Sequence, residues 1–199
     1  MAEYVSKAES HAQILDKIRQ SIVLNQERLQ YITAQTPVAT SAWLARNLLE
    51  LAIWAEYCRS SQERAQEFRL DGARDAYDAL NIPQELLPSS GHLELRQELL
   101  DKSKDDGFDI EESYTKVASA AKALGRGPLF RHMNKTLSKF AHPTAFAVFS
   151  LGSDTEVLLK EEFRSVGLFF ASAGLMFTDL TGAVQNPYRT SNLPEGERS

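Results

Sequence analysis

The chain has only one cysteine and lacks a long apolar run. These two features limit the classes of protein to which it can belong. Cys58 alone cannot form an intramolecular disulfide, which fits a reducing compartment. It lies in an apolar helical pattern, so we expect a small buried hydrophobe rather than a nucleophile. The most apolar stretch, 166–177, is shorter than the ~20 residues of a bilayer-spanning helix and predicts a core helix. With no secretion signal visible near Met1, we expect a cytoplasmic protein without membrane association.

Motifs for metal and nucleotide chemistry are also missing. None of the four histidines lies in a His-Glu-x-x-His or Glu-x-x-His pattern, and one cysteine cannot build a zinc site. The glycine-rich segment 124–128 lacks the Lys-Ser/Thr ending and the preceding strand of a phosphate-binding loop. There is no Gly-x-Ser-x-Gly elbow. We therefore predict no bound metal and no cofactor.

Acidic residues are absent from the whole segment 113–153. This acid-free segment contains six basic residues: Lys116, Lys122, Arg126, Arg131, Lys135 and Lys139. Elsewhere the chain's 27 Asp and Glu outnumber its basic residues, and the net charge is −5. Such an uneven charge distribution predicts a local anion-facing surface in an otherwise acidic protein. A solvated helix face is the alternative interpretation.

Apolar residues recur at helical spacing and strand-type alternation is absent, so the sequence predicts an all-α protein. We expect long helices over 3–34, from a cap at Thr40 or Ser41 onward, from Gly127-Pro128 to His142, and over 155–184 from a cap at Ser153 or Asp154. The second helix is expected to continue through the charged stretch 62–78, which should project from the core or bend near Gly72. Shorter helices are predicted over 92–104 and from Asp109 to Ala123. The arrangement expected is an antiparallel bundle with a short-helix midsection, forming one domain over 1–184 with a disordered tail over 185–199.

The best candidate for chemistry lies in the helix that ends at His142. Arg131, Lys135, Ser138 and His142 fall along one helical stripe, and Lys139 lies beside it. His142 precedes a proline and therefore lies near the negative pole of the helix. Such a cluster suits phosphate binding or proton transfer. The alternative is a structural histidine that bonds a carbonyl or carboxylate of a neighbouring helix.

A second polar group interrupts the apolar second helix. Arg46 and Glu50 are four residues apart among apolar neighbours, and buried charges require partners. We expect Glu50 or Glu56 to face the bundle interior and to meet His142 or Lys139. The alternative places Arg46 and Glu50 at the solvent edge.

These two clusters carry a family resemblance. Arg46-Asn-Leu-Leu-Glu50 together with 137–144, Leu-Ser-Lys-Phe-Ala-His-Pro-Thr, resembles an uncharacterised all-helical bacterial domain family. That family has an Arg…Glu helix and a Leu-Ser-x-x-x-His-Pro signature, and it resembles in turn the HEPN superfamily of nucleic-acid-associated helical domains. The resemblance covers the helix order over 40–180.

HEPN domains are in many cases dimeric ribonucleases, toxins or antiphage effectors. Their site pairs an arginine with a histidine four to six residues later near a helix end, and His142 corresponds to that histidine. The arginine is missing here. Lys135 is the nearest basic residue, since Arg131 lies too far back, and lysine lacks the planar fork of arginine. The resemblance therefore implies binding or scaffolding more than RNA cleavage.

The leading hypothesis is a HEPN-like, nucleic-acid-associated homo-oligomer from a defence or toxin–antitoxin setting. If it is a metal-independent ribonuclease, His142 is the acid or base, and Lys135 or Lys139 stabilises charge on the phosphate. The predicted binding residues are Arg131, Ser138, Arg126 and Lys122. One alternative is a non-catalytic bundle that binds a protein partner through the charged segments 62–78 and 92–112. Another is a small-molecule pocket lined by Trp43, Trp54 and phenylalanines.

Overall fold

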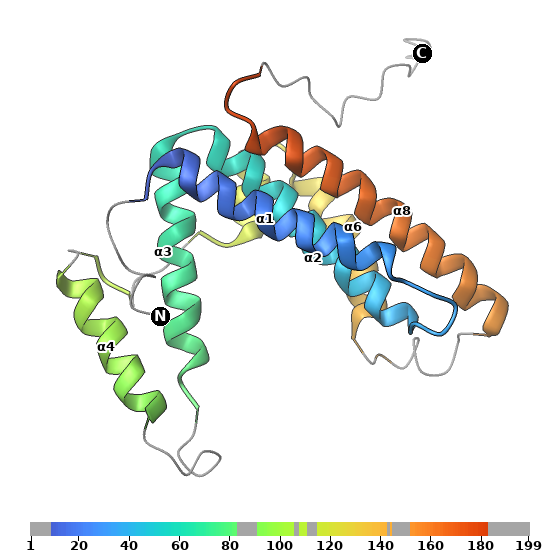
Figure 1. Ribbon diagram of the computed structural model, residues 1–199, viewed down its shortest axis with the longest axis horizontal. Coiled ribbons are helices and arrows are strands. Elements are labelled where there is room, and N and C mark those ends of the chain that lie inside the picture. The colour runs from blue at the N-terminus through green and yellow to red at the C-terminus, as the bar shows by residue number, and fades with distance from the viewer. Residues whose placement is uncertain are drawn as a thin grey trace, which may run out of the picture.

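The computed structural model describes residues 9–82, 91–105, 108–110, 115–142, 144 and 152–182. Helices account for 81% of these residues, and the described part of the chain contains no strand. The all-α prediction is therefore confirmed (Figure 1). The tail expected over 185–199 lies outside the described residues.

Seven helices make up the described structure. They are α1 (His11–Gln30), α2 (Val38–Arg59), α3 (Gln62–Ala79), α4 (Gly91–Asp105), α5 (Val117–Ala123), α6 (Gly127–Ala141) and α8 (Ser153–Thr178). Four long helices, α1, α2, α6 and α8, lie alongside one another, while α3 and α4 extend to one side (Figure 1).

Helix α2 forms the centre of the core because it is apolar around most of its circumference. Leu44, Leu48, Leu49, Ile53 and Cys58 are all at most 3% exposed. Helix α1 contributes one apolar stripe from Ile14 to Leu29, which is the pattern of a helix with one buried face. Helices α1, α6 and α8 pack around α2, and the core lies between them and α2.

Glycines allow α8 to approach α2 closely. A Cβ built on Gly167 would lie 3.3 Å from Ala45 Cα, and one built on Gly174 would lie 3.3 Å from Ala52 Cα. The contacts advance in the same direction along both helices, so α2 and α8 run parallel. The same glycines also face α1, Gly167 at Leu29 and Gly174 at Ile22, so this order is reversed along α1. Helix α1 is therefore antiparallel to both α2 and α8.

The start of α2 corrects one prediction. The helix begins at Val38 with Pro37 as N-cap, and neither Thr40 nor Ser41 caps it. The N–H of Val38 instead donates to Glu156 Oε1 at 3.3 Å, so an acceptor on α8 serves the first turn. Lys160 lies 3.5 Å from the same carboxylate and also donates to Ala34 O at 2.6 Å. The cap is remote, so local sequence spacing could not reveal it.

Other helix ends also differ from prediction. The stretch 62–78 is a separate helix, capped by the Ser61 hydroxyl, and Gly72 lies inside it. The predicted helix from Asp109 begins only at Val117. Its predicted stop holds, because Gly125 adopts φ +72°, a conformation that glycine accepts readily.

Helix α8 is shorter than predicted. Its N-cap is Gly152 rather than Ser153 or Asp154, and it ends at Thr178 instead of continuing to 184. The Asp179 carboxylate accepts hydrogen bonds from Thr181 N at 2.8 Å and from Thr181 Oγ1 at 2.6 Å. This local turn competes with further helix.

Candidate functional site

Helix α6 presents its cations to solvent because its opposite face is firmly anchored. Phe130, Leu137 and Phe140 are at most 7% exposed and pack into the core. Arg131 and Lys135 lie on the exposed side, as the helical spacing predicts. Pro128 occupies the first turn, where its missing N–H costs little.

A cavity of about 440 Å³ lies between α5 and α6. Its polar lining comes from Lys122 of α5 and from Arg131, Asn134 and Lys135 of α6, and Pro128 and Phe130 supply apolar surface. No carboxylate is among the residues that line it. The structure therefore gathers two of the predicted binding residues, Lys122 and Arg131, together with Lys135, which was predicted to stabilise charge on the phosphate, into one cationic cavity.

Arg126 does not line this cavity. Its guanidinium donates to the Glu56 carboxylate at 3.0 and 3.3 Å, and both side chains are largely buried. One expectation is corrected here, because Glu56 meets Arg126 rather than His142 or Lys139. The predicted binding role of Arg126 stays a prediction. The relative direction of two helices explains why Glu56 meets Arg126. Helix α6 runs antiparallel to α2, so its beginning faces Glu56 and its end faces Arg46.

Arg46 organises a polar cluster at that far end of α6. Its Nε donates to Asn134 Oδ1 at 2.9 Å, its Nη1 lies 3.3 Å from His142 Nε2, and its Nη2 lies 3.1 Å from Glu50 Oε1. Arg46 and Glu50 are each a little over a quarter exposed. They lie neither in the dry core nor at the open solvent edge. Glu50 reaches this cluster through Arg46.

The contact with Arg46 bears on the tautomer of His142. A guanidinium has five donors and no acceptor, so a hydrogen bond at this contact needs His142 Nε2 as the acceptor, with the ring proton on Nδ1. His142 also ends α6 in an extended conformation, φ −113° and ψ 153°, which a following proline favours.

Asn134 was not among the residues predicted from sequence. It lines the cationic cavity and also accepts the hydrogen bond from Arg46 Nε. Its spacing offered a signal, since it lies four residues after Phe130 and three before Leu137, at the edge of the buried face. Asn134 therefore joins the cationic cavity to the Arg46–His142 cluster.

The predicted stripe divides into two parts in space. Arg131 and Lys135 line the cationic cavity, whereas His142 belongs to the Arg46 cluster. Lys139 is exposed and Ser138 half-buried, and neither is among the residues lining the cavity. Their predicted roles stay predictions.

The Cys58 thiol adds no further chemistry to this site. Burial, with a smaller contribution from Glu67, raises the pKa of the Cys58 thiol to about 12, and the side chain is fully buried. The expectation of an inert, buried cysteine is confirmed. Among the residues that the structure describes, no three His, Cys, Asp or Glu side chains gather as a metal site.

None of the described helices is long and apolar enough to cross a bilayer.

Comparison of this chain with known protein families, with curated proteins and with solved structures finds no match. The functional interpretation therefore depends on the geometry of the cationic cavity and the Arg46–His142 cluster.

Proposed function

We propose that this protein is a nucleic-acid-associated module that binds single-stranded RNA through phosphate contacts at the cationic cavity. The observation that carries the proposal is the grouping of Lys122, Arg131 and Lys135 around a cavity with no carboxylate in its lining. The chain as a whole has a net charge of −5, so this surface is a local exception. The resemblance to HEPN-like domains supports the same class of ligand.

Binding at this cavity depends on charge rather than on base recognition. Lysine ammonium groups act as point charges for phosphate, and the Arg131 fork can hold two phosphate oxygens. Phe130 is only 5% exposed, so it offers no platform on which a base could stack. We therefore expect weak to moderate, sequence-tolerant binding that salt reduces strongly.

The geometry supports binding better than cleavage. Arg46 brings to His142, from another helix, the arginine that the sequence around His142 lacks. A general base needs an available lone pair, however, and His142 Nε2 is engaged by Arg46 in this arrangement. Metal-independent cleavage is therefore a separate outcome of the experiment rather than part of the proposal.

The test is titration of a short labelled single-stranded RNA, followed by fluorescence anisotropy at several salt concentrations. Replacing Lys122 and Lys135 with alanine should weaken binding and lower the slope of log affinity against log salt by about 1.4, near 0.7 for each lost phosphate contact. Lys104→Ala is the matched control, because Lys104 is exposed on α4, away from α5 and α6. It should leave the slope unchanged.

Two outcomes overturn the proposal: no binding at low salt, or an unchanged slope in the double variant. The same RNA is also followed on a gel for wild type and His142→Ala. Cleavage by the wild type that is lost in His142→Ala would extend the proposal to a ribonuclease. Intact RNA in both would leave a binding module.

A non-catalytic protein-interaction bundle is the second candidate function. Large apolar side chains on α8 are well exposed, including Val157, Leu158, Phe169 and Met176, at 41–62%. Exposed apolar side chains of this size are typical of surfaces that bind a protein partner or a second copy. Self-association measured by sedimentation and weakened by Phe169→Ser, without RNA binding, would favour this function.

A further inference from the structure

The two tryptophans of the chain lie in opposite environments. Trp54 is 8% exposed, and its ring lies 4.8 Å from the Phe68 ring and 5.8 Å from the Tyr57 ring, centroid to centroid, as in a packed core. Trp43, near the start of α2, is 44% exposed. In the part of the chain that the structure describes, no aromatic ring or cation stacks on its indole. A large part of the Trp43 ring is therefore open to a ligand.

Trp43 lies on the same face of α2 as the Arg46–Glu50 pair. Residues three and seven positions apart share a helix face, and Arg46 and Glu50 follow Trp43 at these spacings. Arg46 in turn donates to Asn134, which lines the cationic cavity. The indole is therefore three residues, about 4.5 Å along the axis of α2, from a side chain that is bonded to the wall of that cavity.

The charges divide this surface into two kinds of subsite. The three cations of the cationic cavity have no ion-pair partner among the described residues. On the face of α2 that carries Trp43, the charge of Arg46 is balanced by Glu50 at 3.1 Å. A phosphate group is therefore attracted to the cavity, whereas the uncharged face of a base suits the indole beside it.

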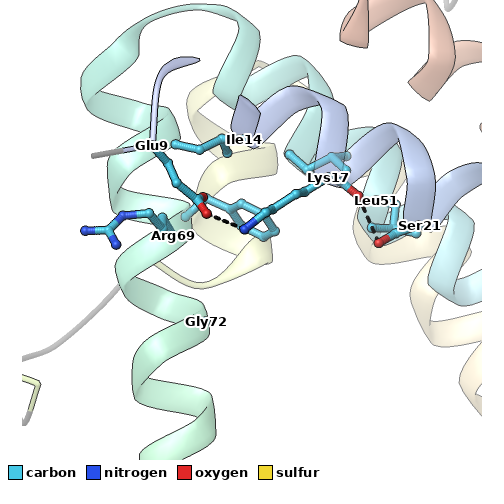
Figure 2. Close-up of a pocket in the computed structure, with 9 residues that line it drawn as sticks. Glu9, Ile14, Lys17, Ser21, Leu51, Arg69 and Gly72 are labelled. Atoms are coloured by element: carbon cyan, nitrogen blue, oxygen red, sulfur yellow. Dashed lines mark hydrogen bonds and ion pairs between the residues drawn. The ribbon is translucent and has the colours of Figure 1, made fainter. Parts of the chain in front are cut away.

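A second cavity, of about 370 Å³, offers no comparable place for a phosphate. It is lined by residues of α1, α2 and α3 and by Glu9. Its Lys17 ammonium group reaches the Glu9 carboxylate, with which it forms an ion pair (Figure 2). Arg69 donates to Gln66 and points away from the cavity (Figure 2). We therefore expect the phosphates of a bound strand at the cationic cavity, next to the face of α2 that carries Trp43.

We propose that the Trp43 indole stacks on a base of the same RNA strand whose phosphate lies in the cationic cavity. Trp43 thereby extends the proposed RNA-binding function, on which this contact depends, from phosphates to bases. Every base has a π face, so the stack adds affinity without reading sequence. Phe130 inside the cavity cannot take this role, because it is only 5% exposed.

The test compares two strands of equal length and charge as ligands of the full chain. One is oligoadenylate, and the other is a sugar-phosphate strand without bases. Calorimetric titration measures both affinities, and tryptophan fluorescence follows the stack. Oligoadenylate should bind about tenfold more tightly than the base-free strand and should quench the emission of Trp43.

Variants separate the stack from the phosphate contacts. Trp43→Ala should bind the two strands with equal affinity and lose the quenching, while Trp43→Tyr should keep part of the preference for oligoadenylate. The slope of log affinity against log salt should stay unchanged in Trp43→Ala, because a stacked base releases no counterion. Replacing Lys122 and Lys135 with alanine should instead weaken both strands alike and lower the slope. Phe169→Ala is the matched control, because Phe169 is 47% exposed on α8, which does not line the cavity.

The outcomes distinguish the stack from the proposed function. Equal affinity of the wild type for the two strands, with the salt dependence intact, would overturn the stack and leave the proposed function standing. A preference for oligoadenylate that survives in Trp43→Ala would also overturn it, because the base would then stack elsewhere. No binding of either strand at low salt would overturn the proposed function and the stack together. Self-association weakened by Trp43→Ala, measured by sedimentation, would then assign the indole to a protein interface. Because Trp43 is exposed, circular dichroism should show the variant folded like the parent.

Discussion

Arg46 Nη1 lies 3.3 Å from His142 Nε2, although 96 residues separate the two in the chain. The same guanidinium contacts Asn134 and Glu50, so one side chain connects α2 with the middle and the end of α6. The contact orients the imidazole, and a hydrogen bond there needs the tautomer with the ring proton on Nδ1. Arg46 therefore positions His142, whatever role His142 has.

We predict that Arg46→Met destabilises the protein by about 1–3 kcal/mol, because three polar partners lose a charged donor at a partly buried position. The free energy of unfolding, measured with urea, checks this prediction. Arg131→Met is the control on the exposed face of α6 and should cost less than about 0.5 kcal/mol. Equal losses in the two variants would contradict a special role for Arg46.

The ring of His142 gives a second measurement of the same contact. In the wild type, the nitrogen chemical shifts of the imidazole should show a proton on Nδ1 and an unprotonated Nε2. Arg46→Met should allow the tautomer with a proton on Nε2 to appear, since the donor that fixed the ring is gone. An unchanged tautomer in the variant would show that another group orients the ring.

Periodicity predicted what depends on local spacing. The apolar residues of α1, from Ile14 to Leu29, are buried as their helical spacing indicates. The exposed cations of α6 were also predictable, because lysine and arginine rarely enter a core without partners. Gly125 ends α5 for the same local reason, its need for a positive φ.

What the sequence could not reveal depends on tertiary contacts. Asn134 acquires its role only because α6 runs antiparallel to α2 and brings it to Arg46. Glu156 serves the first turn of α2 from 118 residues away, and no local capping pattern records such a partner. The cationic cavity likewise needs α5 and α6 to lie side by side, although its cations were predicted one by one.

Asp71 should make stability depend on pH. Burial, and then the charge of Asp75, raises the pKa of Asp71 from 3.8 to about 7, with Arg74 opposing the shift. Its Oδ1 is buried and has no hydrogen-bond partner among the described residues. The folded state thus keeps this proton at a pH where the unfolded chain has released it. The resulting stability is present below about pH 4 and is lost as the pH rises through about 7.

We therefore predict that the free energy of unfolding falls between about pH 4 and pH 7, by at most about 1.4 kcal/mol per pH unit from this group. Asp71→Asn should flatten the decline. Urea unfolding at a series of pH values measures it, and Asp105→Asn, an exposed site on α4, is the control. Stability that rises over this range because of Asp71 would contradict the prediction.

Gly174→Ala should destabilise the α2–α8 contact despite the better helix propensity of alanine. The added Cβ would meet Ile22 Cδ1 at 2.7 Å and the backbone of Ala52 at 3.3 Å. Overpacking of this kind costs about 1–3 kcal/mol, against a propensity gain of about 1 kcal/mol. Thermal and urea unfolding should show a net loss, and Ser172→Ala, exposed on the same helix, should show none. Ile22→Val removes the clashing methyl and should recover part of the loss.

The last prediction concerns the remote cap of α2. The Lys160 side chain is 7% exposed, donates to Ala34 O and lies 3.5 Å from the Glu156 carboxylate that accepts from Val38 N. Lys160→Met leaves a carbonyl without its donor and a carboxylate without its cation, so we expect a loss of about 1–3 kcal/mol. Glu156→Gln keeps an oxygen for Val38 N and should cost less.

A double-mutant cycle measures the pair directly. Glu156→Gln removes the charge that Lys160→Met leaves uncompensated. The double variant should therefore lose less stability than the sum of the two single variants, with a coupling of about 0.5–3 kcal/mol. Arg164 and Glu161 form a more exposed pair on the same helix, and the equivalent cycle there should give less than about 0.5 kcal/mol. Additive losses at Lys160 and Glu156 would mean that the lysine supports the Ala34 carbonyl alone. The remote cap of α2 would then act without it.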